Sequence, residues 1–215
     1  MVETTTGLVL RTRPLTETSL IVHWLTRDLG RLATVAKGAR RPKSPFLGKL
    51  DVFYRADFSF ARSRRSELHT LREVSLRETH PIFRRELGLL QQAVYCATLI
   101  EQTTETETPL PAVFDLLEGF LAYVHHAEPR AHAVFAFELK LLDELGLQPD
   151  LDQTRLNPGT RRLVEVLGQT DWAEVNRLRL SVPQTTEVRQ FLHGFLVFHL
   201  GRIPSGRDTA LAAAG

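Results

Sequence analysis

Basic side chains are concentrated in an early stretch of the chain, where their spacing suits contact with phosphate groups. Residues 31–65 contain ten lysines and arginines against two acids, Asp51 and Asp57. Neutralising phosphates with such side chains releases condensed counterions, so binding would depend steeply on salt. An alternative interpretation is a solvated basic face without a partner. The candidates for contact with a nucleic-acid backbone are Lys37, Arg40, Arg41, Lys43 and Lys49, then Arg64 and Arg65, with Arg11, Arg13 and Arg31 as a weaker extension.

Aromatic residues lie among these cations, and exposed aromatic rings can stack on unpaired bases. Tyr54, Phe58 and Phe60 share one face of an alternating segment, which predicts that they fill a core. Phe53 is on the opposite face of that segment, and Phe46 lies within the basic stretch. We therefore expect Phe46 and Phe53 to be the rings available for base stacking.

The sequence contains no motif typical of an enzyme. It has no Gly-x-x-x-x-Gly-Lys phosphate loop, no Gly-x-Gly-x-x-Gly, no Gly-x-Ser-x-Gly and no His-Glu-x-x-His. Cys96 is the single cysteine, which excludes an internal disulfide and any zinc site with two thiolates. His193 and His199 are six residues apart, a spacing that does not share one helix face. We expect no catalytic residues, no metal and no cofactor.

The segments that carry these cations alternate between apolar and polar residues. Five such segments, bounded by turn residues, occupy 7–13, 19–26, 31–37, 52–60 and 68–74. None of the connections between them holds a helix long enough for a crossover, which excludes a parallel βαβ sheet. Five strands in so short a chain predict a small closed barrel of the OB-fold type, a module that often binds oligonucleotides.

The apolar period changes to that of helices from about residue 80. Segments 86–101, 114–124, 135–145 and 187–200 read as amphipathic helices, with shorter ones at 163–167 and 172–180. Charge changes at the same point, because residues 1–80 hold 15 basic and 8 acidic side chains and residues 81–215 hold 12 and 17. We expect an α+β chain with an OB-fold nucleic-acid-binding domain at 1–79, a helical domain at 80–205 and a frayed tail at 206–215.

No run of 18 apolar residues is present, so we expect no transmembrane helix and no membrane contact. The first residues also lack the basic-then-apolar order of a signal peptide. These features favour a cytoplasmic protein, and DNA binding would make it nucleoid-associated.

Several of these segments together resemble a known family. Residues 13–20 (Arg-Pro-Leu-Thr-Glu-Thr-Ser-Leu), 29–31, 35–40 (Val-Ala-Lys-Gly-Ala-Arg) and 67–73 (Glu-Leu-His-Thr-Leu-Arg-Glu) are similar to the amino-terminal domain of RecO, the bacterial recombination mediator. Residues 137–142 and 145–151 are similar to the central helix of that family. The resemblance spans most of residues 7–151, and segment 13–40 is its most specific part.

The resemblance implies an OB-fold followed by a helical domain, and also a role. RecO proteins bind single- and double-stranded DNA and anneal complementary strands. They work with RecR, contact the acidic carboxyl-terminal tail of the single-strand-binding protein, and so help RecA to load at gaps. None of these activities requires a cofactor. An OB-fold protein-interaction adaptor and an RNA-binding protein without annealing activity are the alternatives.

One departure from the family pattern concerns zinc. Many relatives carry a four-cysteine zinc module after the central helix. Here residues 152–157 lead almost directly into the next helical segment, and the region has no cysteine. We therefore expect the zinc module to be absent, and the resemblance does not extend to partner contacts made there.

Overall fold

The computed structural model describes residues 2–213, which divide into two compact units. The first unit contains Met1–Pro81 together with Thr104–Asp115, and the second contains Ile82–Thr103 with Leu116–Gly215. We expected two consecutive domains that meet between residues 79 and 80. The units instead interleave, because the segment Thr104–Asp115 packs with the strands of the first unit.

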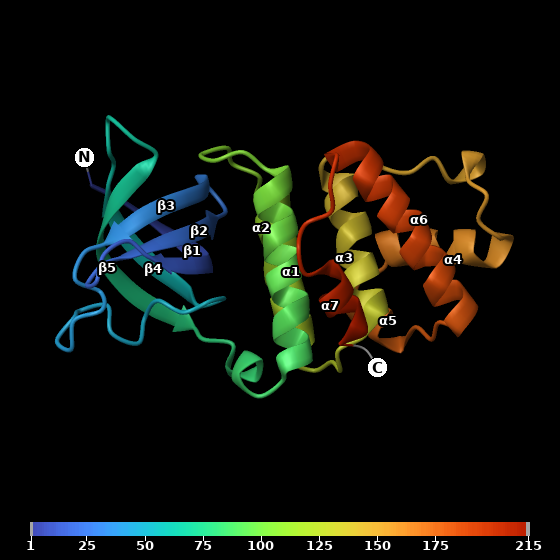
Figure 1. The fold of residues 1–215 in the computed structure, drawn as a ribbon, viewed down its shortest axis with the longest axis horizontal. Coiled ribbons are helices and arrows are strands. Elements are labelled where there is room, and N and C mark those ends of the chain that lie inside the picture. The colour runs from blue at the N-terminus through green and yellow to red at the C-terminus, as the bar shows by residue number, and fades with distance from the viewer. Residues whose placement is uncertain (1, 214–215) are drawn as a thin grey trace. The chain divides into compact units, whose positions relative to one another are not determined.

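Five strands close into a barrel in the first unit (Figure 1). They are β1 (Val2–Pro14), β2 (Leu20–Thr26), β3 (Gly30–Ala36), β4 (Arg55–Ala61) and β5 (Leu68–Glu78). The order around the barrel is β1-β2-β3-β5-β4. All neighbouring strands are antiparallel except β3 and β5, which are parallel, with Ala33 opposite Leu68. The expected five-stranded OB-type barrel is confirmed.

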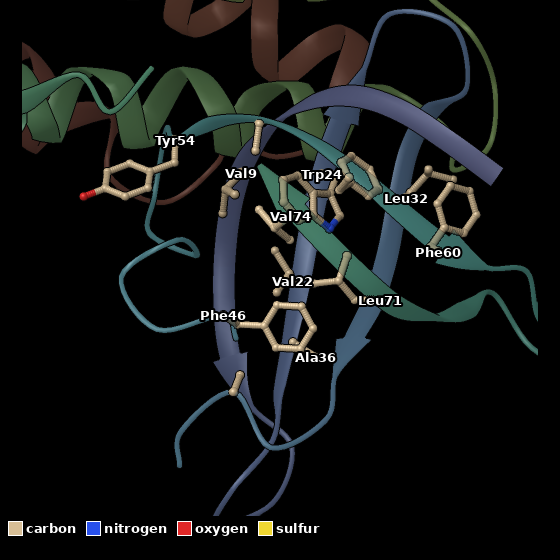
Figure 2. Close-up of a cluster of buried hydrophobic side chains, with 13 residues drawn as sticks. Val9, Val22, Trp24, Leu32, Ala36, Phe46, Tyr54, Phe60, Leu71 and Val74 are labelled. Carbon is tan, nitrogen blue, oxygen red and sulfur yellow. The ribbon is translucent and has the colours of Figure 1, made fainter. Parts of the chain in front are cut away.

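The interior of the barrel is filled by alternate residues of each strand, as the period of two requires. Trp24 and Phe58 stack with ring centroids 4.1 Å apart, and the Trp24 Nε1–H donates to Thr34 Oγ1 at 2.8 Å. Tyr54, Phe58 and Phe60 belong to this buried cluster, as predicted (Figure 2). The barrel therefore has an aromatic core filled by side chains, and bound molecules must contact its outer surface or its loops.

The segment Thr104–Asp115 is held along the first unit by main-chain contacts. The Glu107 N–H donates to the Arg31 carbonyl at 2.9 Å, next to a β-bridge between Arg31 and Thr106. Gly30 lies beside this segment with φ +71°, and a β-carbon there would collide with the backbone of Thr108. Glycine is the residue that fits both this backbone conformation and this close approach.

Seven α-helices account for most of the described residues from 82 onward (Figure 1). They are α1 (Leu87–Thr103), α2 (Pro111–Val124), α3 (Ala131–Glu144), α4 (Pro158–Gln169), α5 (Trp172–Arg177), α6 (Val182–Leu200) and α7 (Arg207–Ala212), with 3-10 turns at Pro81–Arg84 and Leu151–Gln153. Within the second unit α3 is packed by α1, α4, α5, α6 and α7. Ten of its residues are buried, which makes α3 the central element of that unit.

Helix boundaries follow local capping chemistry. Asn157 accepts a hydrogen bond from the Thr160 N–H and starts α4, and Asp171 does the same for α5 through the Glu174 N–H. Ser181 starts α6 with a full capping box that includes Gln184. These side chains satisfy N–H groups that a helix start otherwise leaves without partners, which fixes where each helix begins.

The frayed tail expected at 206–215 is wrong for the part of it that the structure describes. Residues Arg207–Ala212 form α7, and Arg207, Ala210 and Leu211 are buried. The Arg207 guanidinium binds Glu138 of α3 through two contacts, Nε to Oε1 at 2.7 Å and Nη2 to Oε2 at 2.9 Å. This buried ion pair orders the segment, and residues 214–215 lie outside the described part of the chain.

Among the described residues, no helix combines the length and the apolar character that a membrane span requires.

Candidate nucleic-acid interface

The connection between β3 and β4 carries most of the predicted phosphate contacts. Lys37, Arg40, Arg41 and Lys43 are all exposed. Within residues 2–213, none of these four cations forms an ion pair with a carboxylate. Four closely spaced positive charges without acidic partners create a positive potential that attracts a polyanion.

This connection is held in place by turns and by its own buried residues. The Arg41 N–H donates to the Gly38 carbonyl at 3.0 Å, and the Arg40 N–H donates to the Thr18 carbonyl at 2.9 Å. Ala39 and Phe46 are buried in the core cluster. The cations therefore lie on a loop whose backbone is anchored, so little backbone conformational entropy would be lost when they bind a ligand.

Arg11 and Arg13 extend the positive surface along β1. Both are exposed, and the β1–β2 register places Arg11 opposite His23 and Arg13 opposite Ile21. Burial lowers the pKa of His23 to about 4, and the charges of Arg11, Arg13 and Arg31 add to that shift. The pairing of β1 with β2 therefore extends the positive surface along β1.

Arg31 and Lys49 have partners within the protein. The Arg31 Nε donates to Thr104 Oγ1 at 2.8 Å, and its Nη2 also donates to the Thr104 carbonyl. The Lys49 Nζ donates to the Val74 carbonyl at 3.2 Å and is half-buried. Both side chains are therefore more restrained than the exposed cations of the loop.

Arg64 and Arg65 form a separate site on the β4–β5 connection, and both are exposed. The loop is closed by a hydrogen bond from the Ser63 N–H to His69 Nδ1 at 3.2 Å. Neighbouring Arg62 is neutralised, because its Nε lies 2.7 Å from Glu3 Oε1 and its Nη1 lies 2.5 Å from Glu107 Oε2.

The two groups of cations lie on different connections. Lys37, Arg40, Arg41 and Lys43 follow β3, whereas Arg64 and Arg65 lie between β4 and β5. We call the larger group, Arg11, Arg13, Lys37, Arg40, Arg41 and Lys43, the basic end of the barrel.

Phe46 and Phe53 were expected to stack on bases, and this expectation is contradicted by their burial. Phe46 is 6% exposed and Phe53 is fully buried. Phe46 belongs to the same core cluster as Ala36 and Leu71 (Figure 2). Phe53 precedes β4 in a turn with φ +62°, and its N–H donates to the Val9 carbonyl at 2.7 Å, so the alternation of the strand does not extend to it.

Two residues that sequence reasoning did not select contribute to this unit. Arg72 is exposed on β5 and lines a hollow of about 400 Å³ together with Lys49 and Phe46. Its place at an exposed position of an alternating strand could have revealed it. Glu107 pairs with Arg62 and His69, and its position in a polar connection gave no signal of this role.

Comparisons with known proteins bear on both units. Residues 1–80 match the family model described as "Recombination protein O N terminal", and residues 84–154 match "Recombination protein O C terminal". The first match covers the whole barrel with its basic loops. The second match begins at the last residue of the first 3-10 turn, includes α1, α2 and α3, and ends just after the second 3-10 turn.

Curated relatives carry the same description. The chain is 33% identical over 153 residues to "DNA repair protein RecO" of Exiguobacterium sibiricum, covering 71% of this chain and 60% of that protein. It is 29% identical over 167 residues to the protein of that name from Syntrophus aciditrophicus, covering 75% and 64%. The chain thus spans less than two thirds of these two relatives.

A third relative is matched almost from end to end. The "DNA repair protein RecO" of Anaeromyxobacter dehalogenans is 30% identical over 232 residues, covering 92% of this chain and 91% of that protein. Together with the two family models that match the barrel and the helical segment, this similarity shows that the chain belongs to the RecO family.

Proposed function

We propose that this protein is a recombination mediator that binds single- and double-stranded DNA through the basic end of the barrel. The observation that carries the proposal is the group of exposed cations on the anchored β3–β4 connection, Lys37, Arg40, Arg41 and Lys43, which no carboxylate of the described residues neutralises. Membership of a family whose proteins are named for DNA repair supports the same assignment.

The proposed mechanism is electrostatic. Two complementary strands repel each other through their phosphates, and this repulsion slows their encounter. Cations of the basic end lower that repulsion by lying close to both backbones, and they release counterions as they do so. Contacts to phosphates carry no sequence information, so annealing would proceed without sequence preference and without any catalytic group.

Arg64 and Arg65, on the β4–β5 connection, supply a second point of contact in this proposal. A single strand bound to an OB fold contacts roughly 4–16 nucleotides, which gives it the length to reach both loops. Arg31, Lys49 and Arg72 have weaker roles, since the first two already bond within the protein.

The partners in this proposal follow from family membership. They are RecR, the acidic carboxyl-terminal tail of the single-strand-binding protein, and RecA, which would load at the gaps that the mediator prepares. This role belongs to a cytoplasmic protein associated with the nucleoid.

The test is annealing of two complementary labelled oligonucleotides, with and without the protein, across a series of salt concentrations. We expect acceleration that declines as salt rises. Absence of acceleration, together with absence of DNA binding at low salt, would favour a protein-interaction adaptor. Absence of acceleration, with RNA bound more tightly than DNA, would favour the RNA-binding alternative.

A further inference from the structure

Helix α6 is only partly covered by the second unit. Val188, Leu192 and Leu196 are fully buried and pack the helix against that unit. Phe198, by contrast, is 83% exposed, which is more than any other large apolar side chain of the described residues. A ring left in water contributes little to the hydrophobic stabilisation of the fold, and Val197 beside it is also exposed. Contiguous exposed apolar surface of this kind marks an interaction site.

Phe198 belongs to a group of rings that we call the aromatic row of α6, which consists of Phe191, Phe195, Phe198 and His199. The ring centroids of Phe191 and Phe195 are 6.0 Å apart. The His199 ring joins the row, with its centroid 4.3 Å from that of Phe195 and 5.0 Å from that of Phe198. The three phenylalanines are separated by four and then three positions, so they share one side of the helix. The rings therefore form one surface, and Phe198 is its most accessible part.

The aromatic row is a surface on which flat groups can stack. Aromatic side chains stack on nucleic-acid bases whatever the sequence, because every base has a π-face. An aliphatic side chain has no such face. Between residues 191 and 198 a helix advances about 10 Å, and one strand of DNA presents a phosphate roughly every 3.4 Å along its axis. The row is therefore long enough for roughly two or three successive bases.

The basic residues around the row are complementary to a phosphate backbone. Residues 188–206 contain Arg189, His193, His199 and Arg202 and no aspartate or glutamate, although residues 81–215 as a whole contain more acids than bases. Arg202 follows the C-terminal end of α6, is exposed, and has no carboxylate partner among residues 2–213. A phosphate group next to the row would therefore meet a guanidinium that is not yet neutralised.

Two carboxylates close to this stretch are held by partners within the protein. The Glu187 carboxylate accepts from the Asn157 N–H at 2.8 Å and from the Thr160 hydroxyl at 2.5 Å. Asp208 Oδ1 lies 2.6 Å from Arg189 Nη2, so these two charges offset each other. The positive charge that remains for a ligand is that of Arg202.

We propose that the aromatic row of α6 is a stacking surface for unpaired bases of single-stranded DNA, with Arg202 in contact with the phosphate backbone. This inference rests on the proposed function, which supplies DNA as the ligand, and it adds a contact surface in the helical unit. Bases of a duplex already stack on one another and are closed to the row. The row therefore favours single strands, whereas the basic end of the barrel contacts phosphates of both forms.

The test uses the full chain and measures its affinity for labelled oligodeoxythymidine, for an abasic strand of the same length and for a duplex. Phe198→Leu keeps an apolar side chain but removes the π-face, and it should weaken binding of oligodeoxythymidine by about tenfold. Phe198→Tyr keeps a ring and should stay within about twofold. Affinity for the duplex and for the abasic strand should not change in either variant. Because this side chain is 83% exposed, neither substitution disturbs the core.

Leu87→Ala on α1 is the matched control. It removes a large apolar side chain of the same unit that is 65% exposed and lies outside the row, and it should leave every affinity unchanged. NMR of phenylalanine rings gives a direct readout. The Phe198 signals should shift when oligodeoxythymidine is added and should stay in place with the abasic strand, which has no base to stack.

Three results would overturn the proposal. The first is equal affinity of Phe198→Leu and Phe198→Tyr for oligodeoxythymidine, and the second is a loss that is as large for the duplex as for the single strand. The third is a wild-type dimer in light scattering that Phe198→Glu abolishes while single-strand affinity is unchanged, which would assign the row to a second copy of the chain.

These failures are distinguishable from failure of the proposed function. Weaker DNA binding in Arg40→Glu/Arg41→Glu, together with wild-type binding in Phe198→Leu, would keep the basic end as the DNA interface and remove the aromatic row from it. Absence of any DNA binding by the wild-type chain at low salt would overturn both.

Discussion

His69 Nε2 lies 2.7 Å from Glu107 Oε1, although the two residues are 38 positions apart. His69 is 1% exposed, and its Nδ1 accepts from the Ser63 N–H, so the proton of the neutral ring is on Nε2 and is donated to Glu107. The same carboxylate also pairs with Arg62. One acidic residue of the segment Thr104–Asp115 thus helps to set the shape of the loop that presents Arg64 and Arg65.

Replacing this carboxylate should loosen the loop. Glu107→Ala leaves the buried Nε2–H of His69 without an acceptor, which costs roughly 1–3 kcal/mol. Glu107→Gln keeps an acceptor oxygen and should cost less. Amide hydrogen exchange at Ser63 is the measurement, with faster exchange expected in the alanine variant. Unchanged protection of Ser63 in Glu107→Ala would show that the loop does not depend on this contact.

Charge reversal at the basic end should weaken DNA binding by a similar factor for every DNA sequence. The double variant Arg40→Glu/Arg41→Glu removes two of the proposed phosphate contacts and should lower the log–log salt slope by about two. Fluorescence anisotropy with single- and double-stranded oligonucleotides across a salt series would measure both affinity and slope. Arg162→Glu, in the helical unit, is the control. Wild-type affinity and slope in the double variant would remove the basic end from the DNA interface.

The burial of Phe46 leads to a prediction that separates packing from stacking. Phe46→Leu keeps an apolar anchor in the core, so it should lower the free energy of unfolding by only about 1–1.5 kcal/mol. DNA affinity should stay within about twofold, whereas loss of a base-stacking ring would cost roughly 1–3 kcal/mol in binding. A selective loss of single-stranded binding in this variant would restore Phe46 as a stacking residue.

Two histidines should make stability depend on pH between about 4 and 6.5. Burial is the main cause that lowers the pKa of His23 and His132 to about 4, so the folded state binds fewer protons than the unfolded chain in this range. Stability from these groups is therefore present above pH 6.5 and is lost as the pH falls towards 4. Urea unfolding at intervals across that window would show the slope.

The double variant His23→Gln/His132→Gln provides the check on this assignment. It should flatten the profile between pH 4 and 6.5, because no group with a depressed histidine pKa then remains at these two positions. An equally steep profile in the double variant would attribute the slope to other residues. Carboxylates such as Asp57, whose pKa is lowered by hydrogen bonds from Arg77 and Thr6, lose their contribution to stability below about pH 5, so the slope above pH 5 is the part that tests the histidines.

Alternation predicted the barrel because it is a local property of each strand. Ala56, Phe58 and Phe60 point inward as the period of two requires. The same rule was wrong for Phe53, since a residue with φ +62° is not part of a strand. It gave no information about Phe46, because a side chain in a loop enters the core through tertiary packing that no short-range pattern records.

Long-range pairs explain most of what the sequence did not predict. The small, alanine-rich segment after residue 206 reads as a frayed tail, and its order comes from Arg207 binding Glu138, 69 residues away. Glu107 belongs to a run of threonines and glutamates that is typical of a linker. The cations of the basic end were predictable as a group, because most of them are close neighbours in the sequence.

The pair between Glu138 and Arg207 also has a consequence for the order in which the protein matures during synthesis. The barrel unit needs no residue beyond Asp115, so it can close while later helices are still being translated. Glu138 is fully buried in the finished protein, yet its cationic partner appears only when residue 207 emerges from the ribosome. The helical unit therefore stays incomplete until residue 207 has been made, and a chain that stops after α6 would carry a folded barrel attached to an incomplete helical unit.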